Sequence, residues 1–504
     1  MSHDFDVAIV GCGPVGATLA ALLGQRGLRV VAIERGREIY PLPRAVVIDG
    51  EIVRMYQMLG LADSIAQASS PMRHFRYENE KHEVLLDWDL PADESGDQGW
   101  ASAHMFHQPD VERLLRDKMA EFPAVELWDG HEVVGLEQTD DEVALTVRDL
   151  SRGATKRLTA AYTVGCDGGS SMVRKHMGVK FESLGPAQDW VVVDGVGPHK
   201  IDLEEGQMIG YCWPERPHLF LPTGNDRLRW EFLVRPEDDR EEIESDAGIR
   251  RLIERFVDPD EVVLERRAVY TFLSLLAEHW RDRRIFLAGD AAHMQPPLRA
   301  QGLCSGIRDA VNLSWKLEAV FKGRAEEDLL DTYESERRAH SKAWIKLATD
   351  LAKIINTTDP QIAAARDAAM LAHPPEPVDD IPLLGPGLHG DEGPPAGKLS
   401  QQLVLEDGTR MDDVTGDRFL VAMAEGIEDG LPADSRELIA DADQFHVLEP
   451  GSAQANEYLA RHGDVKAIVV RPDRYILGVA ADAEGLAAVL AKWSAKLCAT
   501  GVKS

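Results

Sequence analysis

The 504-residue chain has no long apolar run, few cysteines and fewer basic than acidic residues. No stretch approaches the roughly 20 consecutive apolar residues that a membrane helix requires, so we expect no membrane-spanning segment. The first residues, MSHDFDVAIVG, carry acids and no basic cluster, which argues against a secretory signal. Together with the scattered cysteines described below, these absences predict a cytoplasmic protein.

Basic residues are in deficit, with 55 Lys and Arg against 86 Asp and Glu and a formal net charge of −31. Such a surface repels the phosphates of nucleic acids and of anionic lipids, so we expect neither nucleic acid nor membrane as a partner. The acidity itself is explained most simply as a means of staying soluble.

The five cysteines are scattered and form no C-x-x-C pair. A zinc site, a dithiol redox site and a disulfide framework are therefore not expected, and no metal is predicted. The composition, 44% hydrophobic and 28% charged, is typical of a globular protein. A chain of this length suggests two to four domains.

The N-terminus carries a glycine-rich fingerprint between two apolar runs, in FDVAIVGCGPVGATLAALLGQRGLRVVAIER. The pattern predicts a strand over 7–10, a helix with a stripe of leucines, and a second strand over 29–33. Gly11 allows a tight turn, Gly13 lets a pyrophosphate approach the backbone, and Gly16 lets helix and strand pack closely. The free N–H groups of the helix then face the phosphates.

Glu34 stands at the end of the second predicted strand, where a carboxylate can accept hydrogen bonds from the ribose hydroxyls of an adenosine. With both strands and this acid in place, the fingerprint predicts dinucleotide binding. It does not by itself distinguish NAD from FAD.

A second motif, RIFLAGDAAHMQPPLRAQGLCSG, lies far along the chain and ends a predicted strand in Gly289-Asp290. A carboxylate there can accept hydrogen bonds from ribityl hydroxyls, and glycine permits close approach. The following run predicts a helix that begins near Gly302 and Leu303 and stops near Gly323. N–H groups at its start would stabilise negative charge on a reduced flavin ring, so this motif favours FAD.

These motifs together resemble the FAD-dependent aromatic hydroxylases, the single-component flavoprotein monooxygenases. Within them the chain is most similar to the 3-(3-hydroxyphenyl)propionate hydroxylase and polyketide hydroxylase type. The resemblance covers nearly the whole chain. Besides the two motifs above, it rests on LPRAVVIDGEIVRMYQMLGLAD, FHQPDVERLL, VGCDGGSSMVRKHMG and GIRDAVNLSWKL.

The resemblance implies a set of FAD contacts along the cofactor. Glu34 and Arg35 would flank the adenosine ribose, Val133 would contact adenine through its backbone, and Asp290 would bind the ribityl chain. The other implied contacts lie at the pyrophosphate, in an Asp-Gly motif and at the ring: Gly11, Gly13, Val15, Gly16, Arg44, Gln108, Asp167, Gly289, Pro297, Gly302 and Leu303. On local chemistry alone, Arg44 could be a surface cation and Asp167 a turn residue.

The chain departs from the family next to the predicted ring site. Where the family often has Gly-Gln-Gly and then Asn, this chain has Ala300-Gln301-Gly302 and then Cys304. Arg299 is also unusual here. We interpret Arg299 as a contact for an anionic substrate, with a solvent-exposed arginine as the alternative.

The segment 185–284 reads as antiparallel strands, and HLFLPTGNDRLRWEFLV predicts a hairpin with its turn at Gly224-Asn225-Asp226. In the family this region is a sheet that roofs the substrate pocket. We take Trp213, Phe220 and Trp230 as candidates for lining that pocket, with a plain core role as an equal alternative.

The expected fold class is α/β. A Rossmann-like FAD-binding domain is predicted over 1–184 and 285–371, with a long helix in EEDLLDTYESERRAHSKAWIKLATDLAKII. The substrate domain covers 185–284, and a proline- and glycine-rich linker covers 372–397. The remaining 398–504 resembles the thioredoxin-like C-terminal domain of phenol and polyketide hydroxylases. Without C-x-x-C it would act structurally or in oligomerisation.

The resemblance implies an enzyme that uses NADH or NADPH and O2 to hydroxylate a phenolic or electron-rich aromatic compound through a flavin C4a-hydroperoxide. The expected partners are that small aromatic substrate and O2, and a homo-oligomer is possible. No catalytic base is evident, although His107, His293 and Arg299 are the nearest candidates. A flavin-dependent halogenase or dehydrogenase on the same scaffold, or a non-catalytic FAD-binding protein, is the alternative.

Overall fold

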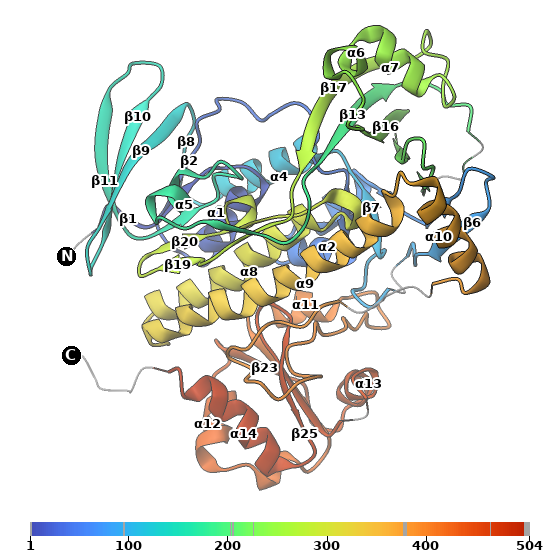
Figure 1. The fold of residues 1–504 in the computed structure, drawn as a ribbon. Coiled ribbons are helices and arrows are strands. Elements are labelled where there is room, and N and C mark those ends of the chain that lie inside the picture. The colour runs from blue at the N-terminus through green and yellow to red at the C-terminus, as the bar shows by residue number, and fades with distance from the viewer. Residues whose placement is uncertain are drawn as a thin grey trace.

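The computed structural model describes residues 3–93, 96–201, 203, 206–224, 226–375, 381–463 and 465–497. Asn225 of the predicted hairpin turn, part of the predicted linker and Cys498 lie outside the described residues. Three larger sheets organise the chain (Figure 1). Within the described ranges, no helix has the length and apolar character needed to cross a membrane.

The first sheet has eight strands and builds the N-terminal fingerprint. The predicted strand–helix–strand unit is confirmed, with every β1 residue except Asp6 buried. Strands β20, β11, β1, β2 and β8 run parallel, as alternating strands and helices predict. In sheet order the strands are β19 (Arg281–Asp282), β20 (Ile285–Leu287), β11 (Thr155–Gly165), β1 (Phe5–Val10), β2 (Val30–Ile33) and β8 (Val125–Trp128), with β10 (Val143–Asp149) and β9 (His131–Gln138) paired beside β11.

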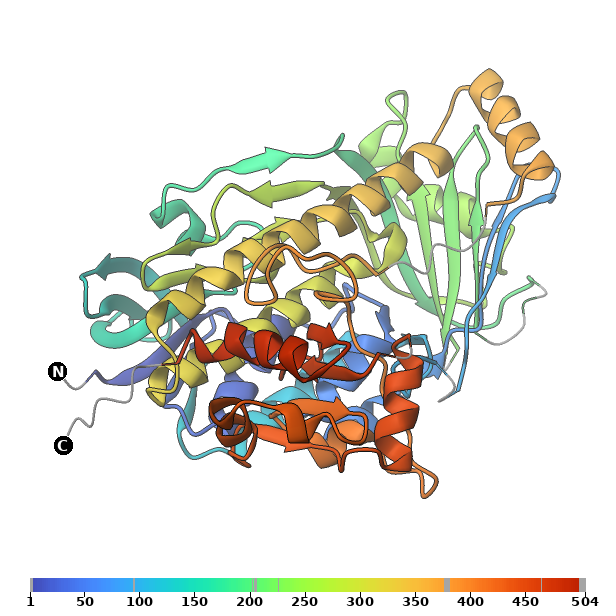
Figure 2. The same cartoon turned by 90° about the horizontal axis from the view of Figure 1, so that it is seen from below.

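Helices α1 (Pro14–Gln25) and α8 (Gln301–Phe321) pack against this sheet through one core that includes Leu19, Leu23, Ile307 and Val311. α8 ends where the sequence predicted, because Gly323 adopts a φ of +65°. The long predicted helix is α9 (Asp331–Ile355), and it lies beside α8 (Figures 1 and 2). These two helices form the spine onto which the other parts dock.

The second sheet has seven strands and is antiparallel except at β14–β5. The predicted hairpin is confirmed as β15 and β16. The sheet draws two strands from residues 74–89, well before the rest. In order the strands are β17 (Val263–Phe272), β13 (Gln188–Val196), β16 (Arg227–Leu233), β15 (His218–Gly224), β14 (Gln207–Tyr211), β5 (His74–Glu78) and β6 (Val84–Asp89).

The two faces of this seven-stranded sheet contact different parts of the chain. The outer face packs on α6 (Arg240–Glu244) and α7 (Asp246–Ile253). The inner face packs on Leu298 and on the C-terminal end of α9 at Ala352 and Ile355. Side chains alternate between these faces, as the strand period of two requires.

The third sheet has four strands and lies near the C-terminus. Its strands are β23 (Phe445–Val447), β22 (Phe419–Met423), β24 (Ala467–Val470) and β25 (Ile476–Ala480), and only β22–β23 is parallel. α14 (Ala483–Ser494) and α13 (Ala453–Arg461) pack in separate cores on it. Trp315 of α8 enters the α14 core, which docks this sheet onto the spine (Figure 2).

Smaller elements complete the fold. Two three-stranded sheets link the larger ones: β12 (Phe181–Ser183), β18 (Leu275–Ala277) and β21 (His293–Met294), and β3 (Val47–Asp49), β7 (Ala103–Met105) and β4 (Ser70–Pro71). The remaining helices are α2 (Gly50–Gln57), α3 (Ala62–Gln67), α4 (Gln108–Ala120), α5 (Met172–His176), α10 (Pro360–Ala372), α11 (Met411–Thr415) and α12 (Ala433–Ile439).

Candidate functional site

Three sequence motifs meet at the carboxyl edge of the eight-stranded sheet: the glycine-rich turn after β1, the Asp167-Gly168 motif after β11 and the Gly289-Asp290 motif after β20. Val10, Gly165 and Leu287, the last residues of β1, β11 and β20, pair in register. The Cys166 N–H donates to the Val10 carbonyl at 2.8 Å, and the Ala288 N–H donates to the Gly165 carbonyl at 3.0 Å. The residues that follow each strand therefore lie side by side, where open α/β sheets bind their ligands.

The fingerprint glycines differ in what a side chain would meet. A Cβ on Gly16 would stand 2.0 Å from the Gly11 carbonyl oxygen, and Gly11 itself has a φ of +96°. A Cβ on Gly13 would meet nothing within 4 Å. The turn thus needs glycine at Gly11 and Gly16 for packing, whereas Gly13 borders open space that a pyrophosphate could approach.

Val15 joins the first motif to the second. An added Cβ on Gly289 would lie 3.0 Å from a Val15 methyl, and one on Gly306 would lie 2.5 Å from the same methyl. Residues almost 300 positions apart are therefore in direct contact. The first and second motifs therefore pack against each other at Val15.

Glu34 is half-buried, and its carboxylate accepts hydrogen bonds from two backbone N–H groups. Oε2 accepts from Cys12 and Oε1 from Gly36, each at 2.8 Å. Each oxygen keeps a lone pair for a further donor such as a ribose hydroxyl. Arg35 is exposed, and Val133 is buried in the sheet core.

Gln108 holds the segment that carries Arg44. The Gln108 Oε1 accepts from the Arg44 N–H at 3.2 Å and the Ala45 N–H at 2.8 Å, while its Nε2 donates to Glu112. The Arg44 side chain is exposed, with its guanidinium 5.5 Å from the centre of the Tyr40 ring. Gln108 therefore positions this loop, and the charged end of Arg44 is left accessible.

Asp167 begins α5 from the turn after β11. Its Oδ2 accepts from the N–H groups of Met172 at 2.6 Å and Val173 at 3.2 Å. Its Oδ1 is buried and has no hydrogen-bond partner among the described residues. One oxygen is thus structural, and the other is buried without a hydrogen-bond partner among the described residues.

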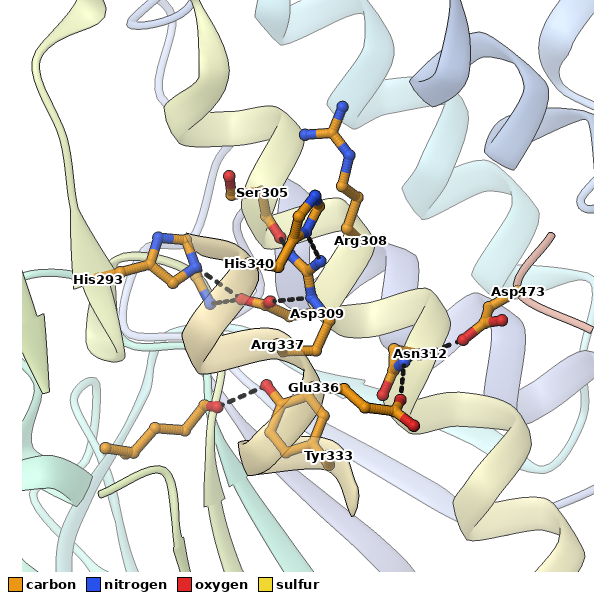
Figure 3. Close-up of polar contacts among 12 residues, drawn as sticks. His293, Ser305, Arg308, Asp309, Asn312, Tyr333, Glu336, Arg337, His340 and Asp473 are labelled. Carbon is orange, nitrogen blue, oxygen red and sulfur yellow. Dashed lines mark hydrogen bonds and ion pairs between the residues drawn. The ribbon is translucent and has the colours of Figure 1, made fainter. Parts of the chain in front are cut away.

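A buried carboxylate that the sequence reasoning missed ties the second motif together (Figure 3). Asp309 of α8 accepts from the Gly289 N–H at 3.0 Å, from His293 Nε2 at 2.7 Å and from Arg337 Nε at 2.9 Å. Burial alone would raise the pKa of Asp309, but His293 and Arg337 lower it below its usual value. Asp309 therefore positions the loop on α8.

The two candidate histidines both make structural contacts. His293 is fully buried, bonds to Asp309 and stacks on Trp280. His107 precedes α4 and contacts Asp110 at 3.0 Å. A proton-transfer role for either residue stays a prediction.

Asp290 follows Gly289 and its side chain is exposed. The surrounding protein nevertheless raises the pKa of its carboxyl group, against the opposing effects of His293 and Arg44. The Asp290 side chain is thus accessible, although the protein around it disfavours its charged form. A ligand hydroxyl could reach it there.

Replacing Asp290 by alanine is expected to weaken FAD retention by roughly 10- to 100-fold, because a charge-assisted hydrogen bond contributes about 1.5–3 kcal/mol. The measurement is the dissociation constant of FAD by flavin fluorescence. Asp282→Ala, on the same sheet but at its edge, is the control. Equal FAD affinity in the two variants would remove Asp290 from the site.

The N-terminus of α8 is free for an anion. Ala300 precedes it with a φ of +55°, no side chain of the described residues caps it, and its first turn holds no acid. A Cβ on Gly302 would meet only Gln295, at 3.9 Å. Pro297 and Leu303 are half-buried beside this opening. Uncapped N–H groups stabilise negative charge, as a reduced flavin ring would require.

The inner face of the seven-stranded sheet lies over this loop. Leu298 packs there with Tyr77, Leu219 and Leu221. Arg299 is half-buried, its guanidinium lies 5.8 Å from the centre of the Trp88 ring, and burial lowers its pKa. Arg299 therefore lies where the loop before α8 meets the inner face of the seven-stranded sheet.

The three aromatic candidates lie elsewhere. Phe220 and Trp230 are fully buried in the outer-face core with Phe256. Trp213 packs on that core, contacts Arg255, and donates from its indole to the Asn79 carbonyl at 2.9 Å. The structure does not bring them together with Arg299. In the sequence, charged residues alternate with apolar ones along β16. This alternation was the signal that could have found the residues of the inner face.

FAD fits the residues present. The glycine turn leaves room beside Gly13, Asp290 is an accessible acceptor, and the α8 N-terminus offers unused donors. Contacts for the two ends of a long dinucleotide are thereby assembled along one edge.

Comparisons with known proteins agree with this geometry. A family model described as an FAD binding domain matches residues 4–348. A probable NADH-specific resorcinol 4-hydroxylase of Rhodococcus jostii (strain RHA1) is 36% identical, over 96% of this chain and 93% of the relative. A 3-(3-hydroxy-phenyl)propionate/3-hydroxycinnamic acid hydroxylase of Burkholderia cenocepacia (strain HI2424) is 35% identical, over 97% and 96%.

One solved structure extends the likeness to the whole fold. The crystal structure of the flavin-dependent monooxygenase PieE in complex with FAD and substrate superposes with a TM-score of 0.80. The match covers 98% of this chain and 100% of that chain, at 21% identity. At that identity it supports the fold alone.

Proposed function

Because this chain belongs to the FAD-dependent aromatic hydroxylases, monooxygenases that use NAD(P)H and O2 on phenolic or electron-rich rings, we propose that its substrate is a meta-substituted phenol with one ring. The two named relatives support this, since resorcinol and 3-(3-hydroxyphenyl)propionate share a phenol with a meta substituent. NADH is the proposed electron donor, because the Rhodococcus jostii relative is named as NADH-specific.

The single observation that supports FAD-dependent chemistry here is the convergence of three motifs at one sheet edge, and the substrate class rests on the names of the two relatives. Gly13, Asp167 and Asp290 follow β1, β11 and β20, which are adjacent and parallel. Val15 of the first motif lies against Gly289 of the second. FAD, when bound, accepts hydride from NADH and activates O2 for transfer to the ring. A halogenase or a non-catalytic FAD protein is not favoured by the names of these relatives.

In this proposal the chain positions and shields the reactants. Gly13 and Glu34 would hold the adenosine half, with Arg44 at the phosphates. Asp290 and the N–H groups at Gly302 would orient the ribityl chain and the ring. The apolar inner face at Leu219 and Leu221 excludes water from the substrate, which strengthens every polar contact there.

The finer domain division is part of the proposal. The eight-stranded sheet with α1, α8 and α9 would be the FAD-binding domain, and the seven-stranded sheet the substrate domain. The four-stranded sheet with α13 and α14 would be the thioredoxin-like domain, after the 372–397 linker.

The test is NADH oxidation by the FAD-loaded protein with resorcinol and with 3-(3-hydroxyphenyl)propionate, with product mass measured in parallel. A product heavier by one oxygen atom is expected from one of them. NADH oxidation that neither phenol stimulates, with no oxygenated product, would refute the proposed substrate class.

Replacing Arg299 by alanine is expected to raise KM for the acidic 3-(3-hydroxyphenyl)propionate by about 10- to 100-fold, because a charge-assisted hydrogen bond is lost. KM for neutral resorcinol should change much less. Steady-state kinetics with both compounds decide this, and Arg283→Ala, an exposed arginine paired with Asp140, is the control. Equal effects on the two compounds would contradict a charge-specific role.

A further inference from the structure

Glu231 is a buried carboxylate on the inner face of the seven-stranded sheet. Only 6% of the residue is exposed, and no hydrogen bond to its carboxylate is found within the described ranges. Its nearest cation is Arg229, whose Nη1 lies 3.9 Å from Oε1. Burying a carboxylate without hydrogen-bond donors costs folding free energy, so such a group is a candidate for a functional role.

Arg229 cannot serve as that partner because its donors are occupied elsewhere. It donates to Asp194 at 2.7 and 3.2 Å and to the carbonyls of Pro43 and Arg44 at 2.7 and 2.9 Å. These bonds also join β16 to the loop that carries Arg44. The inner face of β16 therefore points toward the proposed FAD, and Glu231, two residues further along, shares that face.

The sheet register places Tyr77 in the same row as Glu231. Glu231 pairs with Leu219, Leu219 with Gly210, and Gly210 with Tyr77. Three strand spacings of about 4.8 Å put about 14 Å between the outer two Cα atoms. A Cβ on Gly210 would stand 1.9 Å from the Tyr77 ring, so this ring leans across Gly210 toward Leu219. Leu219 therefore lies between Glu231 and Tyr77 in this row.

Tyr77 is also a buried group without a partner. Its hydroxyl makes no hydrogen bond among the described residues, and the residue is 1% exposed. Arg299 is close enough to affect its pKa, and so is Glu231. One row thus brings together a phenol hydroxyl, an apolar side chain and a carboxylate next to Leu298, and these are the kinds of group that a site for a small phenol needs.

We propose that Glu231 is the base that accepts the phenolic proton of the substrate, with Tyr77 as a hydrogen-bond partner of the substrate at the other end of the row. This inference rests on the proposed function. The groups that face Glu231 are Arg229 on its own strand, Asp194 on β13, Arg266 on β17 and Tyr77 on β5.

These surroundings suit a base. Burial raises the pKa of Glu231, Arg229 and Arg266 lower it, and Asp194 raises it, with a net increase over its usual value. Arg266 is held by Asp194 at 2.6 Å, as Arg229 is, so both cations are largely compensated. A carboxylate with a raised pKa is a stronger proton acceptor.

The proposed step moves one proton from the substrate hydroxyl to Glu231. The substrate O–H bond breaks, an O–H bond forms on Glu231, and the electron pair stays on the substrate oxygen. That charge enriches the ring carbons ortho and para to it for electrophilic attack. After oxygen transfer, the substituted carbon loses its hydrogen to solvent as a proton. Aromaticity returns, and Glu231 gives its proton back to the substrate oxygen.

The test compares Glu231→Gln with the FAD-loaded wild type. A fall in kcat/KM for the hydroxylated phenol of about 10²- to 10⁴-fold is expected, as for loss of a general base. The deficit should shrink as pH rises and the phenol ionises in solution. Wild-type activity should fall as pH drops through the raised pKa. Glu237→Gln, an exposed glutamate just after β16, is the matched control and should keep wild-type kinetics.

Binding of 4-nitrophenol gives a readout independent of turnover, because only its ionised form absorbs strongly in the visible. In the wild type, bound 4-nitrophenol and Glu231 share one proton, so the phenolate should appear in two steps, one below and one above its solution pKa. In Glu231→Gln it should appear in a single step. This titration tests Glu231 even if neither proposed substrate is hydroxylated. If Glu231→Gln does not retain FAD, Glu231→Asp and the wild-type titration replace it. A single-step titration of 4-nitrophenol bound to the wild type, or a Glu231→Gln deficit independent of pH, would overturn the proposal.

Discussion

Replacing Glu336 by alanine is expected to lower the free energy of unfolding by about 3–5 kcal/mol, because removal of one partner from a buried ion pair leaves charges uncompensated. Glu336 lies in the middle of α9 and is fully buried. It accepts hydrogen bonds from three segments of the chain: Lys316 Nζ at 2.7 Å and Asn312 Nδ2 at 3.0 Å, Arg471 at 2.8 and 2.9 Å, and the Leu388 N–H at 2.9 Å.

These bonds join the C-terminal sheet to the spine, and Figure 3 shows the part in which Asn312 contacts both Glu336 and Asp473. Asn312 also donates to Asp473 at 2.9 Å, and Arg471 pairs with the same carboxylate. Without Glu336, Lys316 would lose its carboxylate partner and Arg471 would retain only Asp473. We therefore expect the C-terminal sheet to separate first on unfolding.

The carboxylate of Glu336 also predicts that the folded protein loses stability in acid. Burial alone would raise the pKa of Glu336, but Arg471 and Lys316 hold it below its usual value of 4.5. Since the folded pKa is depressed, the stabilisation is complete above that usual value and is lost as pH falls toward the folded pKa. The alanine variant should lose this part of the pH dependence.

Urea unfolding of the FAD-loaded protein, followed by circular dichroism, measures the change. Asp350→Ala on the same helix is the control, because Asp350 pairs with Lys346 and Lys353 at the surface. Exposed pairs contribute about 0–1 kcal/mol. A loss in Glu336→Ala no larger than in Asp350→Ala would show that the buried cluster does not hold the sheet.

Replacing Gly16 by alanine is expected to weaken FAD binding by about 100-fold or more, equivalent to about 2.7 kcal/mol. The new Cβ would lie 2.0 Å from the Gly11 carbonyl oxygen, a backbone atom that cannot move aside cheaply. Helix α1 must shift, and with it Val15, which contacts Gly289. The overpacking itself costs about 1–3 kcal/mol of stability.

Gly13→Ala separates cofactor loss from misfolding. Nothing lies within 4 Å of its added Cβ, and Gly13 has an ordinary φ of −72°. This variant should keep the stability of the FAD-free protein and still lose FAD affinity. Fluorescence titration with FAD and thermal unfolding of the FAD-free proteins measure both quantities. Unchanged FAD affinity in Gly16→Ala would contradict the assigned phosphate turn.

Local signals in the sequence predicted the elements at the carboxyl edge of the eight-stranded sheet, where FAD is proposed to bind. The strand over 7–10, the helix after the glycine turn and the helix stop at Gly323 depend on short-range periodicity and on glycine conformation. Those properties act over a few residues, so the sequence alone determines them. The family resemblance added the cofactor and the class of reaction.

Which face of a strand meets the cofactor was decided only by tertiary packing. Alternation along β16 assigns Trp230 to one face and Glu231 to the other. It does not say which face α7 covers and which face meets the loop at Leu298. The aromatic residues went to the outer core, and the charged ones faced the proposed site.

The buried charges show the same limit. Asp309 and Glu336 stand in helices whose sequences read as amphipathic, where a carboxylate is expected at the surface. Their partners come from remote parts of the chain, 28 residues away for Arg337 and 135 for Arg471. A charge is buried only where such partners compensate its lost hydration. That compensation exists only once the sheets and helices have assembled, so the sequence determined the elements and the tertiary structure determined which of their charges face inward.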